Sequence, residues 1–428
     1  METAIALIVF IVSLAIIATE KINRSVVAIL GAGILLLTKV LNFEEAVEVI
    51  DFNVIGLLVG MMMIVSILSK TGVFEYVAIK SVQFAKGRPV RLLFILSLIT
   101  ALFSAFLDNV TTIVLIVPVT LFIARILDVS PLPFVISEIL FSNIGGAATI
   151  IGDPPNIIIA SAGKIGFNTF LLHMGPFVLI MTAIGLAVIY LFFRKTLRKK
   201  IVKFKKIEQL NTEGVIKDPV LLKKSLFVLA LVLLGFFLHT LLHLEPSVIA
   251  LAGAFLLLLI TGNEVEEAYE KVEWQTIFFF IGLFIIVGGL EKVGILDIFA
   301  HWIKSIVGNN ELYTASFMLG FAGITSGFID NIPITIVLVD LVKEMARIGM
   351  NIKTLWFALA IGADMGGNMT MIGASANVVG IDIYKRSIDK KKDESISFMK
   401  FLKYGAPITI ISLILGLVYV YIRYFLLK

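Results

Sequence analysis

Long apolar stretches separated by short polar loops recur along the whole chain. Examples are residues 3–18, 26–37, 54–68, 177–193 and 406–427. Apolar runs that approach about 20 residues, the length of a helix that crosses a bilayer, are typical of membrane proteins. The pattern therefore predicts an all-α polytopic membrane protein.

Two of the apolar segments are interrupted by the same polar pair, Asp108-Asn109 and Asp330-Asn331. The two pairs lie 222 positions apart (330 − 108). An ionised carboxylate in the middle of a membrane helix costs about 2.5 to 3.5 kcal/mol. Because the chain carries this cost twice, we interpret both aspartates as functional rather than as simple helix caps.

The same spacing relates many other positions, which indicates an internal duplication. At an offset of 222, Ser25, Gly31, Glu45 and Gly60 meet Ser247, Gly253, Glu267 and Gly282; at 221, Gly145, Thr149, Gly152 and Asn156 meet Gly366, Thr370, Gly373 and Asn377. We therefore predict a first transmembrane repeat over residues 1–193, a connector over 194–224 and a second repeat over 225–428.

Each repeat is predicted to contain three plain helices, a segment broken at Asp-Asn, a segment broken at a glycine-rich loop, and a final helix. Broken backbone at membrane depth is tolerated only where protein or a water-filled cavity satisfies its polar groups. If the Asp-Asn segment is a re-entrant hairpin and the glycine-rich segment a broken crossing, each repeat has five crossings. An odd number of crossings makes the second repeat inverted relative to the first.

Charge sets the expected orientation. The chain has 59% hydrophobic and 16% charged residues, a mean hydropathy of +1.03 and a formal net charge of +5. Its connector is rich in lysine and arginine, whereas the loop 42–51 is acidic. Because short cytoplasmic loops are enriched in basic residues, we expect connector 194–224 in the cytoplasm and both termini outside. The positive charge thus reflects membrane topology, and no nucleic-acid partner is expected.

The broken segments supply the candidate ion-binding groups. Carboxylates, amide oxygens, hydroxyls and free helix-end carbonyls are hard ligands that suit protons or small hard cations. Since the chain has no cysteine, thiolate ligands and cysteine nucleophiles are excluded. We expect no cofactor beyond a coupling ion, H⁺ or Na⁺, and the candidate Na⁺ ligands are Asp108, Asn109, Asp330 and Asn331. The other candidate ion-binding residues are Thr111, Thr112, Thr149, Gly152, Asp153, Asn156, Thr335, Asp364, Asn368, Thr370, Gly373, Ser375 and Asn377.

The motifs Asp108-Asn109-Val-Thr-Thr, Asp330-Asn331-Ile-Pro and Gly152-Asp153-Pro154-Pro155-Asn156 give the chain a family resemblance. It resembles the ion transporter superfamily with a citrate-transporter-like domain, especially the arsenite-pump and sodium/proton-antiporter branch that includes the melanosomal P protein. The resemblance covers essentially the whole chain. It implies inverted five-helix repeats with opposed hairpins, a site between the hairpin tips and the broken helices, and a homodimer that works by an elevator-like motion.

The resemblance also implies coupling-ion sites at Asn109 with Thr111 and Thr112, and at Asn331 with Thr335. Carboxylate transporters of the superfamily usually have serine where this chain has Asp108 and Asp330, which argues against a carboxylate substrate. We expect an integral protein of a prokaryotic plasma membrane, with the bilayer and a small inorganic ion as partners. A soluble ATPase partner, as some arsenite pumps employ, stays open.

Several functions remain open at this point, and we rank them by the residues near the aspartates. A sodium/proton antiporter comes first, because four buried carboxylates have no lysine or arginine beside them in the sequence. Arsenite or antimonite efflux comes second and transport of citrate-like carboxylates third. An intramembrane aspartyl protease is a remote alternative, since the chain lacks the Gly-x-Gly-Asp motif of such enzymes and proteolysis does not explain the duplication. We therefore expect a transporter and not an enzyme.

Overall fold

The computed structural model describes residues 1–19, 21–198, 214–262, 265–308, 310–388 and 394–427. Within these ranges all regular structure is helical, which confirms the predicted fold class. Eight helices of the described residues are long and apolar enough to cross a membrane, and three further apolar helices are shorter. Residues 199–213 of the predicted connector lie outside the described residues, and α12 begins at Pro219, within the range assigned to the connector.

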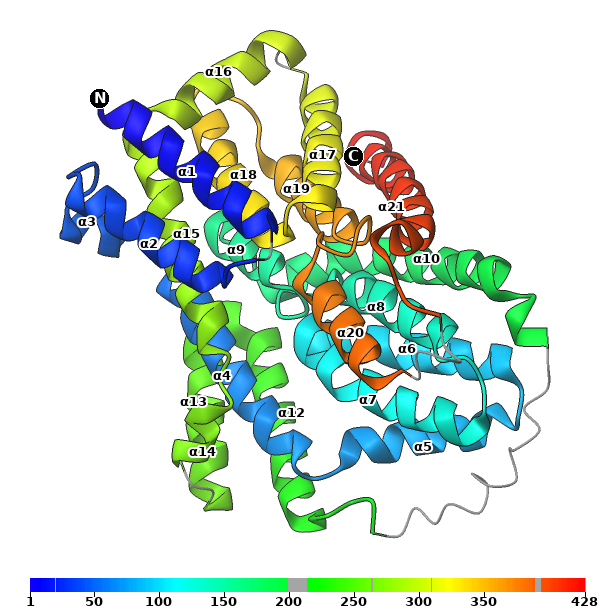
Figure 1. Cartoon of the computed structure of the whole chain (residues 1–428). Helices are drawn as coiled ribbons and strands as arrows, with labels where there is room; N and C mark the ends of the chain where they lie inside the picture. The colour runs from blue at the N-terminus through cyan, green and yellow to red at the C-terminus, as the bar shows by residue number, and fades with distance from the viewer. Residues whose placement is uncertain (20, 199–213, 263–264, 309, 389–393, 428) are drawn as a thin grey trace.

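Each repeat contributes the same succession of helices (Figure 1). The first repeat comprises α1 (Glu2–Thr19), α2 (Arg24–Leu37), α3 (Phe43–Glu48), α4 (Phe52–Ser69), α5 (Val73–Ala85), α6 (Pro89–Phe106), α7 (Asn109–Leu127), α8 (Leu132–Gly146), α9 (Pro154–Gly163) and α10 (Phe167–Phe193). The second comprises α12 (Pro219–Leu242), α13 (Pro246–Thr261), α14 (Val265–Glu270), α15 (Trp274–Lys292), α16 (Ile295–Val307), α17 (Glu311–Phe328), α18 (Asn331–Arg347), α19 (Lys353–Gly366), α20 (Ser375–Ser387) and α21 (Phe398–Tyr421).

The Asp-Asn segments form helical hairpins, α6–α7 in the first repeat and α17–α18 in the second. Each aspartate is the N-cap of the returning helix. Asp108 accepts a hydrogen bond from the backbone N–H of Thr111 at 2.8 Å, and Asp330 accepts one from that of Ile332 at 3.0 Å. Both aspartates therefore lie at the hairpin tips, where each caps the N-terminus of the second helix of its hairpin.

The glycine-rich segments form the predicted broken helices. In the first repeat α8 ends at Gly146 and α9 begins at Pro154, and in the second α19 ends at Gly366 and α20 begins at Ser375. Pro154 stands at the first position of α9. The backbone N–H at this position of a helix makes no intrahelical hydrogen bond, so a proline is tolerated there. Asp153 and Ala374 are the N-cap residues of α9 and α20. The break therefore places one half-helix N-terminus from each repeat in the interior.

The two repeats clasp each other through their plain helices. Helix α2 packs against α15, and α4 packs against α13. A Cβ atom at Gly60 would lie 2.6 Å from the carbonyl carbon of Ala250, and one at Gly282 would lie 2.5 Å from that of Ala28. These contacts are counterparts of each other under the 222-residue offset (60 to 282, 28 to 250), so a pseudo-two-fold axis relates the repeats. Small residues allow this close backbone approach between membrane helices.

A reciprocal pair of ion pairs shows the same symmetry. Lys292 contacts Glu45 at 2.6 Å and Lys70 contacts Glu267 at 2.7 Å, and again each is the counterpart of the other at offset 222. Hydrogen bonding from these lysines holds the pKa of Glu45 and of Glu267 below its usual value. Each attraction is therefore present above the ordinary glutamate pKa and is lost as the pH falls through the lowered value.

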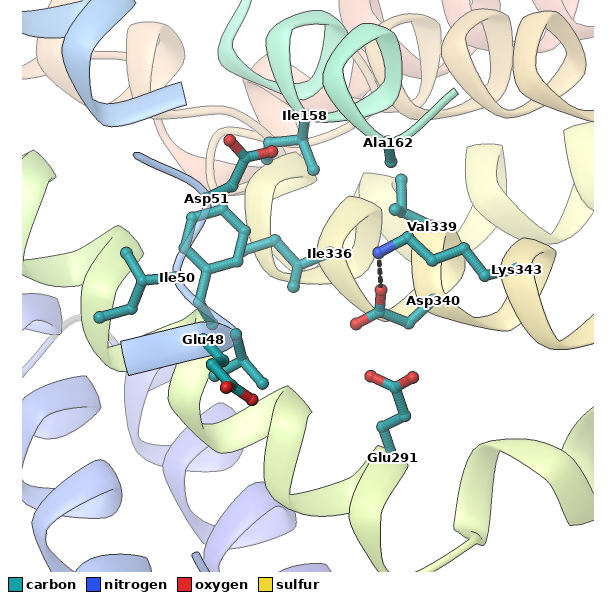
Figure 2. Close-up of a pocket in the computed structure, with 12 residues that line it drawn as sticks. Glu48, Ile50, Asp51, Ile158, Ala162, Glu291, Ile336, Val339, Asp340 and Lys343 are labelled. Carbon is teal, nitrogen blue, oxygen red and sulfur yellow. Dashed lines mark hydrogen bonds and ion pairs between the residues drawn. The ribbon is translucent and has the colours of Figure 1, made fainter. Parts of the chain in front are cut away.

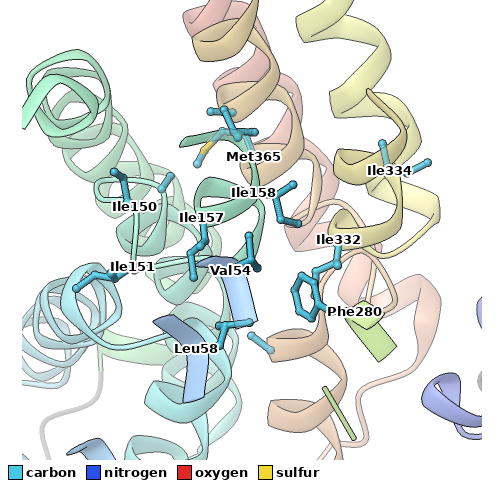
Figure 3. Close-up of a cluster of buried hydrophobic side chains, with 14 of the residues drawn as sticks. Val54, Leu58, Ile150, Ile151, Ile157, Ile158, Phe280, Ile332, Ile334 and Met365 are labelled. Carbon is cyan, nitrogen blue, oxygen red and sulfur yellow. The ribbon is translucent and has the colours of Figure 1, made fainter. Parts of the chain in front are cut away.

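The hairpin helices and the broken helices, here called the hairpin body, pack beside this clasp. Figure 1 shows the clasp helices α2, α4, α13 and α15, together with α1 and α12, toward the left of the view, with most of the hairpin body to their right. Where the bodies meet, apolar side chains face one another (Figure 3). Val54 and Leu58 of α4 and Phe280 of α15 lie beside Ile157 of α9 and Ile332 of α18. This part of the interface between the clasp and the hairpin body is therefore apolar.

Candidate functional site

Four half-helix N-termini meet at the centre of the molecule. Their first residues or N-caps, Asp108 of α7, Asp153 of α9, Asn331 of α18 and Ser375 of α20, line one small cavity of about 10 Å³. A helix N-terminus carries unpaired N–H groups and about half a positive charge, which favours a carboxylate there. Three of the four N-termini have an aspartate at the N-cap position, although the side chain of Asp153 makes no capping hydrogen bond; the fourth, α20, has Ala374 there.

Asp153 connects the two hairpin tips. Its side chain is buried, and its two oxygens accept hydrogen bonds from Nδ2 of Asn109 at 2.8 Å and from Nδ2 of Asn331 at 3.3 Å. The asparagines are counterparts in the two repeats (331 − 109 = 222). One carboxylate from the first broken helix thus binds the equivalent residue of both hairpins.

Several predicted ion ligands instead hold the broken loops in shape. Asn156 donates both amide hydrogens to backbone carbonyls, of Gly146 at 3.2 Å and of Thr149 at 3.2 Å. Its counterpart Asn377 donates to Gly367 at 2.6 Å and to Thr370 at 2.8 Å. Since the NH₂ groups are committed to the loops, a ligand can meet only the amide oxygens of these asparagines, and that of Asn377 already accepts from Asn143.

The threonines of the breaks bind the neighbouring hairpins. Thr149 donates to the carbonyl oxygen of Ala105, and Thr370 donates to that of Gly327 at 2.7 Å. Thr335 donates back to the carbonyl of Asn331 at 2.7 Å, and Thr111 donates to Asp108. Thr112 is buried, and its hydroxyl has no hydrogen-bond partner. Among the predicted threonines, Thr112 alone therefore keeps an unused hydroxyl.

The predicted glycines allow the breaks to approach the hairpins closely. A Cβ atom at Gly152 would lie 2.4 Å from the carbonyl oxygen of Gly146 and 2.6 Å from that of Ser104. At Gly373 it would lie 2.8 Å from the carbonyl oxygen of Gly367. Gly373 also accepts the backbone N–H of Asn331 at 3.2 Å. These glycines therefore position the polar groups, and their own contribution to a ligand is at most a carbonyl oxygen.

Asp364 is buried in the last turn of α19, and neither of its oxygens has a hydrogen-bond partner. Its counterpart Asn143 (364 − 143 = 221) donates to the amide oxygens of Asn368 and Asn377, each at 2.9 Å. The amide oxygen of Asn156 also lacks a hydrogen-bond donor. An ionised Asp364 would therefore be a buried charge without a hydrogen-bond donor among the described residues.

No lysine or arginine stands beside the aspartates in the sequence, yet the fold brings an arginine to one of them. Arg24, the first residue of α2, lies 3.3 Å from the carboxylate of Asp330 and also contacts Ser375. Ser375 donates to Asp330 at 2.8 Å. The arginine is 306 positions from its partner, so the local sequence around the aspartate gave no sign of it.

The sequence also missed Asn143 and Glu273 as members of the site. Asn143 accepts a hydrogen bond from Asn109 at 3.2 Å, and Glu273, the N-cap of α15, lines the small central cavity with Asp108. The alignment of Asn143 with Asp364 was the signal that could have identified the first of these. Glu273 aligns with Asp51 (273 − 51 = 222). The presence of an acidic residue at this position in both repeats was the signal that could have identified Glu273.

Two larger cavities lie in the same part of the chain's fold, and their linings share no residue. One of about 310 Å³ is lined by Glu48, Asp51, Glu291 and Asp340, with Lys343 bonded to Asp340 at 2.7 Å (Figure 2). The other, of about 270 Å³, lies beside Arg24, Asp330 and Ser375 at the end of α1. Asp340, which has no acidic counterpart in the first repeat, thus belongs to a cavity wall.

Within the described ranges, no group of three histidine, aspartate or glutamate side chains is arranged to hold a metal ion. The central cluster instead combines carboxylates with asparagine amides. Carboxylate and amide oxygens are hard ligands, which suit protons and hard cations.

Proteins of similar sequence include an uncharacterised transporter, a membrane protein and the P protein. The chain is 43% identical over 430 residues to an uncharacterised transporter of Mycobacterium tuberculosis, covering 98% of this chain and 99% of that protein. It is 41% identical to a 46 kDa membrane protein of Mycobacterium leprae over the full length of both. It is also 31% identical to the human P protein over 96% of this chain, which corresponds to 58% of the P protein.

A solved structure shares the fold. The YdaH transporter of Alcanivorax borkumensis, described as having an unusual topology, superposes with a TM-score of 0.55 at 12% identity, covering 85% of this chain and 84% of that one. The sequence profile of a family described as citrate transporter matches residues 14–362. The chain is therefore a membrane transporter and belongs to the citrate transporter family.

Proposed function

We propose that the protein is a secondary transporter that exchanges a small monovalent cation for protons by alternating access. The observation that carries this proposal is the position of Asp153, a buried carboxylate bound by an asparagine from each hairpin tip. A charge at such a place is costly in a membrane protein, and intramembrane carboxylates commonly mark ion or proton pathways.

The proposed cation site consists of Asp108 and Asp153 with the side-chain oxygens of Asn109 and Asn331. The central cavity of about 10 Å³ has about the volume that one water molecule needs, so it admits a bare ion. An ion that enters would turn the asparagine amides so that their oxygens face it. Na⁺ and Li⁺ fit this description because they are hard cations that prefer oxygen ligands.

Asp364 is the proposed proton carrier. It stands in the last turn of α19, where the helix end is negative and disfavours a carboxylate, while Asp153 stands at a positive helix N-terminus. A proton on Asp364 would remove the cost of a buried carboxylate whose oxygens have no hydrogen-bond donor. The two buried acids thus have environments suited to different roles, one ionised and one protonated.

Alternating access would use the two cavities and the apolar interface. The cavities of about 310 and 270 Å³ flank the cluster, and the acidic walls of the larger one attract cations. The apolar contacts drawn in Figure 3 let the hairpin body slide past the clasp without breaking many hydrogen bonds. In our proposed orientation the larger cavity opens outside, and the connector lies in the cytoplasm.

The proposal is tested by reconstituting the protein in liposomes that contain a pH-sensitive dye. We expect addition of Na⁺ or Li⁺ to drive proton movement, and the double variant Asp108→Asn with Asp330→Asn to slow it about 100-fold, or about 2.8 kcal/mol. The matched control is Asp297→Asn, an exposed carboxylate on α16, which should leave the rate unchanged. Proton movement that no added cation drives, or that the double variant does not slow, would overturn the proposal.

Transport of a carboxylate is the second candidate, because the matching family is described as citrate transporter and Arg24 borders the cavity of about 270 Å³. We rank it lower since that arginine is already paired with Asp330. Addition of citrate, and of arsenite, to the same liposomes separates these substrates from Na⁺ and Li⁺.

A further inference from the structure

The two hairpin aspartates have different electrostatic surroundings although the repeats are alike. Asp330 contacts the guanidinium of Arg24, and the position equivalent to Arg24 in the second repeat is Pro246 (246 − 24 = 222). Asp108 therefore has no arginine from the corresponding helix. Arg24 and the acid Glu273 both line the central cavity with Asp108, but the ion pair of Arg24 is with Asp330. One hairpin tip is thus ion-paired with the arginine, and the other is not.

Arg24 is held in place by several contacts. Besides Asp330 and Ser375, it reaches the hydroxyl of Thr276 at 3.4 Å, and its guanidinium lies 5.0 Å from the ring centre of Phe279. These partners come from α15, α18 and α20, so the side chain bridges the clasp and the hairpin body. An arginine stays charged at every accessible pH, and stacking on an aromatic ring adds to its attraction to the site.

We propose that Arg24 is a built-in cation that occupies the Asp330 half of the site, so that only the Asp108 half takes up a cation from solution. The guanidinium neutralises Asp330 much as a transported ion would neutralise Asp108. This inference rests on the proposed cation transport and adds an asymmetry between the repeats: one ion site is permanently filled by the chain itself.

The first test is a double-variant cycle on the thermal stability of the purified full-length protein, which needs no transport. Arg24→Gln and Asp330→Asn should each lower the Tm, because each leaves the other charge without its partner. The two together should lower it less than the sum of the single losses. The control pair, Arg24→Gln with Asp297→Asn at the exposed carboxylate on α16, should be additive. Additivity in both pairs would overturn the inference, whether or not the protein transports Na⁺.

The second test uses Na⁺-driven proton movement in liposomes. Asp330→Asn alone leaves the charge of Arg24 unpaired beside the cation path, and we expect it to slow transport. Adding Arg24→Gln should raise the rate of that variant at least about tenfold, or about 1.4 kcal/mol. The same arginine change should not rescue Asp108→Asn. Failure to rescue Asp330→Asn would overturn the inference, while a wild-type protein that moves no protons would overturn the proposed function instead.

Discussion

Replacing Asp153 by asparagine is expected to slow cation-driven proton movement about 1,000-fold, which corresponds to about 4.2 kcal/mol. The substituted amide keeps the size of the side chain but loses the negative charge that neutralises the ion. It also replaces one of the two carboxylate oxygens by an NH₂ group, which cannot accept the hydrogen bond that Asn109 or Asn331 donates in the wild type. The measurement is the initial rate of dye response after a Na⁺ pulse in liposomes of equal protein content.

The control for this variant is Asp218→Asn. Asp218 is also the N-cap of a long helix, α12, and accepts from the backbone N–H groups of Val220 and Leu221 at 2.9 Å, but it is exposed. Asparagine caps helices about as well as aspartate, so transport should stay close to the wild-type rate. An Asp153→Asn protein that is folded and still transports within about threefold of wild type would contradict the assigned role, since that is a change of under 1 kcal/mol.

Replacing Gly145 by alanine is expected to destabilise the protein by about 3 kcal/mol, because the added methyl group overpacks the interior. Its Cβ would lie 2.1 Å from the carbonyl oxygen and 2.4 Å from the Cα of Ala101. Both neighbours are backbone atoms of α6, so the whole first hairpin must move away from α8. The measurement is the shift in Tm of the purified protein, with transport measured on the folded fraction.

Two glycines elsewhere in the helices serve as matched controls. A Cβ atom at Gly33 in α2 or at Gly320 in α17 would meet no heavy atom within 4 Å. Alanine at either position should leave the Tm unchanged or raise it slightly, because alanine favours a helix over glycine by up to about 1 kcal/mol. If Gly145→Ala behaved like these controls, the close contact between α6 and α8 would be wrong.

Much of the fold was visible in the sequence because two signals repeat within it. The apolar stretches predicted the helices, and the offset of 222 predicted which residues of the two repeats would take equivalent places. Asp108 and Asp330 are indeed at the two hairpin tips, and Gly60 and Gly282 make equivalent contacts. The parity of the membrane crossings predicted the inversion, since an odd number of crossings in one repeat must reverse the orientation of the next.

The composition of the site was less predictable, because sequence pattern does not show which atom of a polar side chain faces a cavity. Asn156 and Asn377 were expected to bind an ion, yet their NH₂ groups hold loop carbonyls. Arg24 was missed because its partner lies 306 positions away on another helix. Local motifs locate the polar residues, whereas pairing across helices depends on packing that no short motif encodes.

The central claim is that two inverted halves place one ion site between cavities that open on opposite sides of the membrane. Because the chain contains no cysteine, a single introduced cysteine is the only thiol. The most direct measurement is the labelling of Ala162→Cys, in the larger cavity, and of Val379→Cys, in the smaller one, with a membrane-impermeant thiol reagent applied from each side. We predict that Ala162→Cys reacts from the outside and Val379→Cys from the cytoplasmic side. Labelling of both cysteines from the same side would contradict the account.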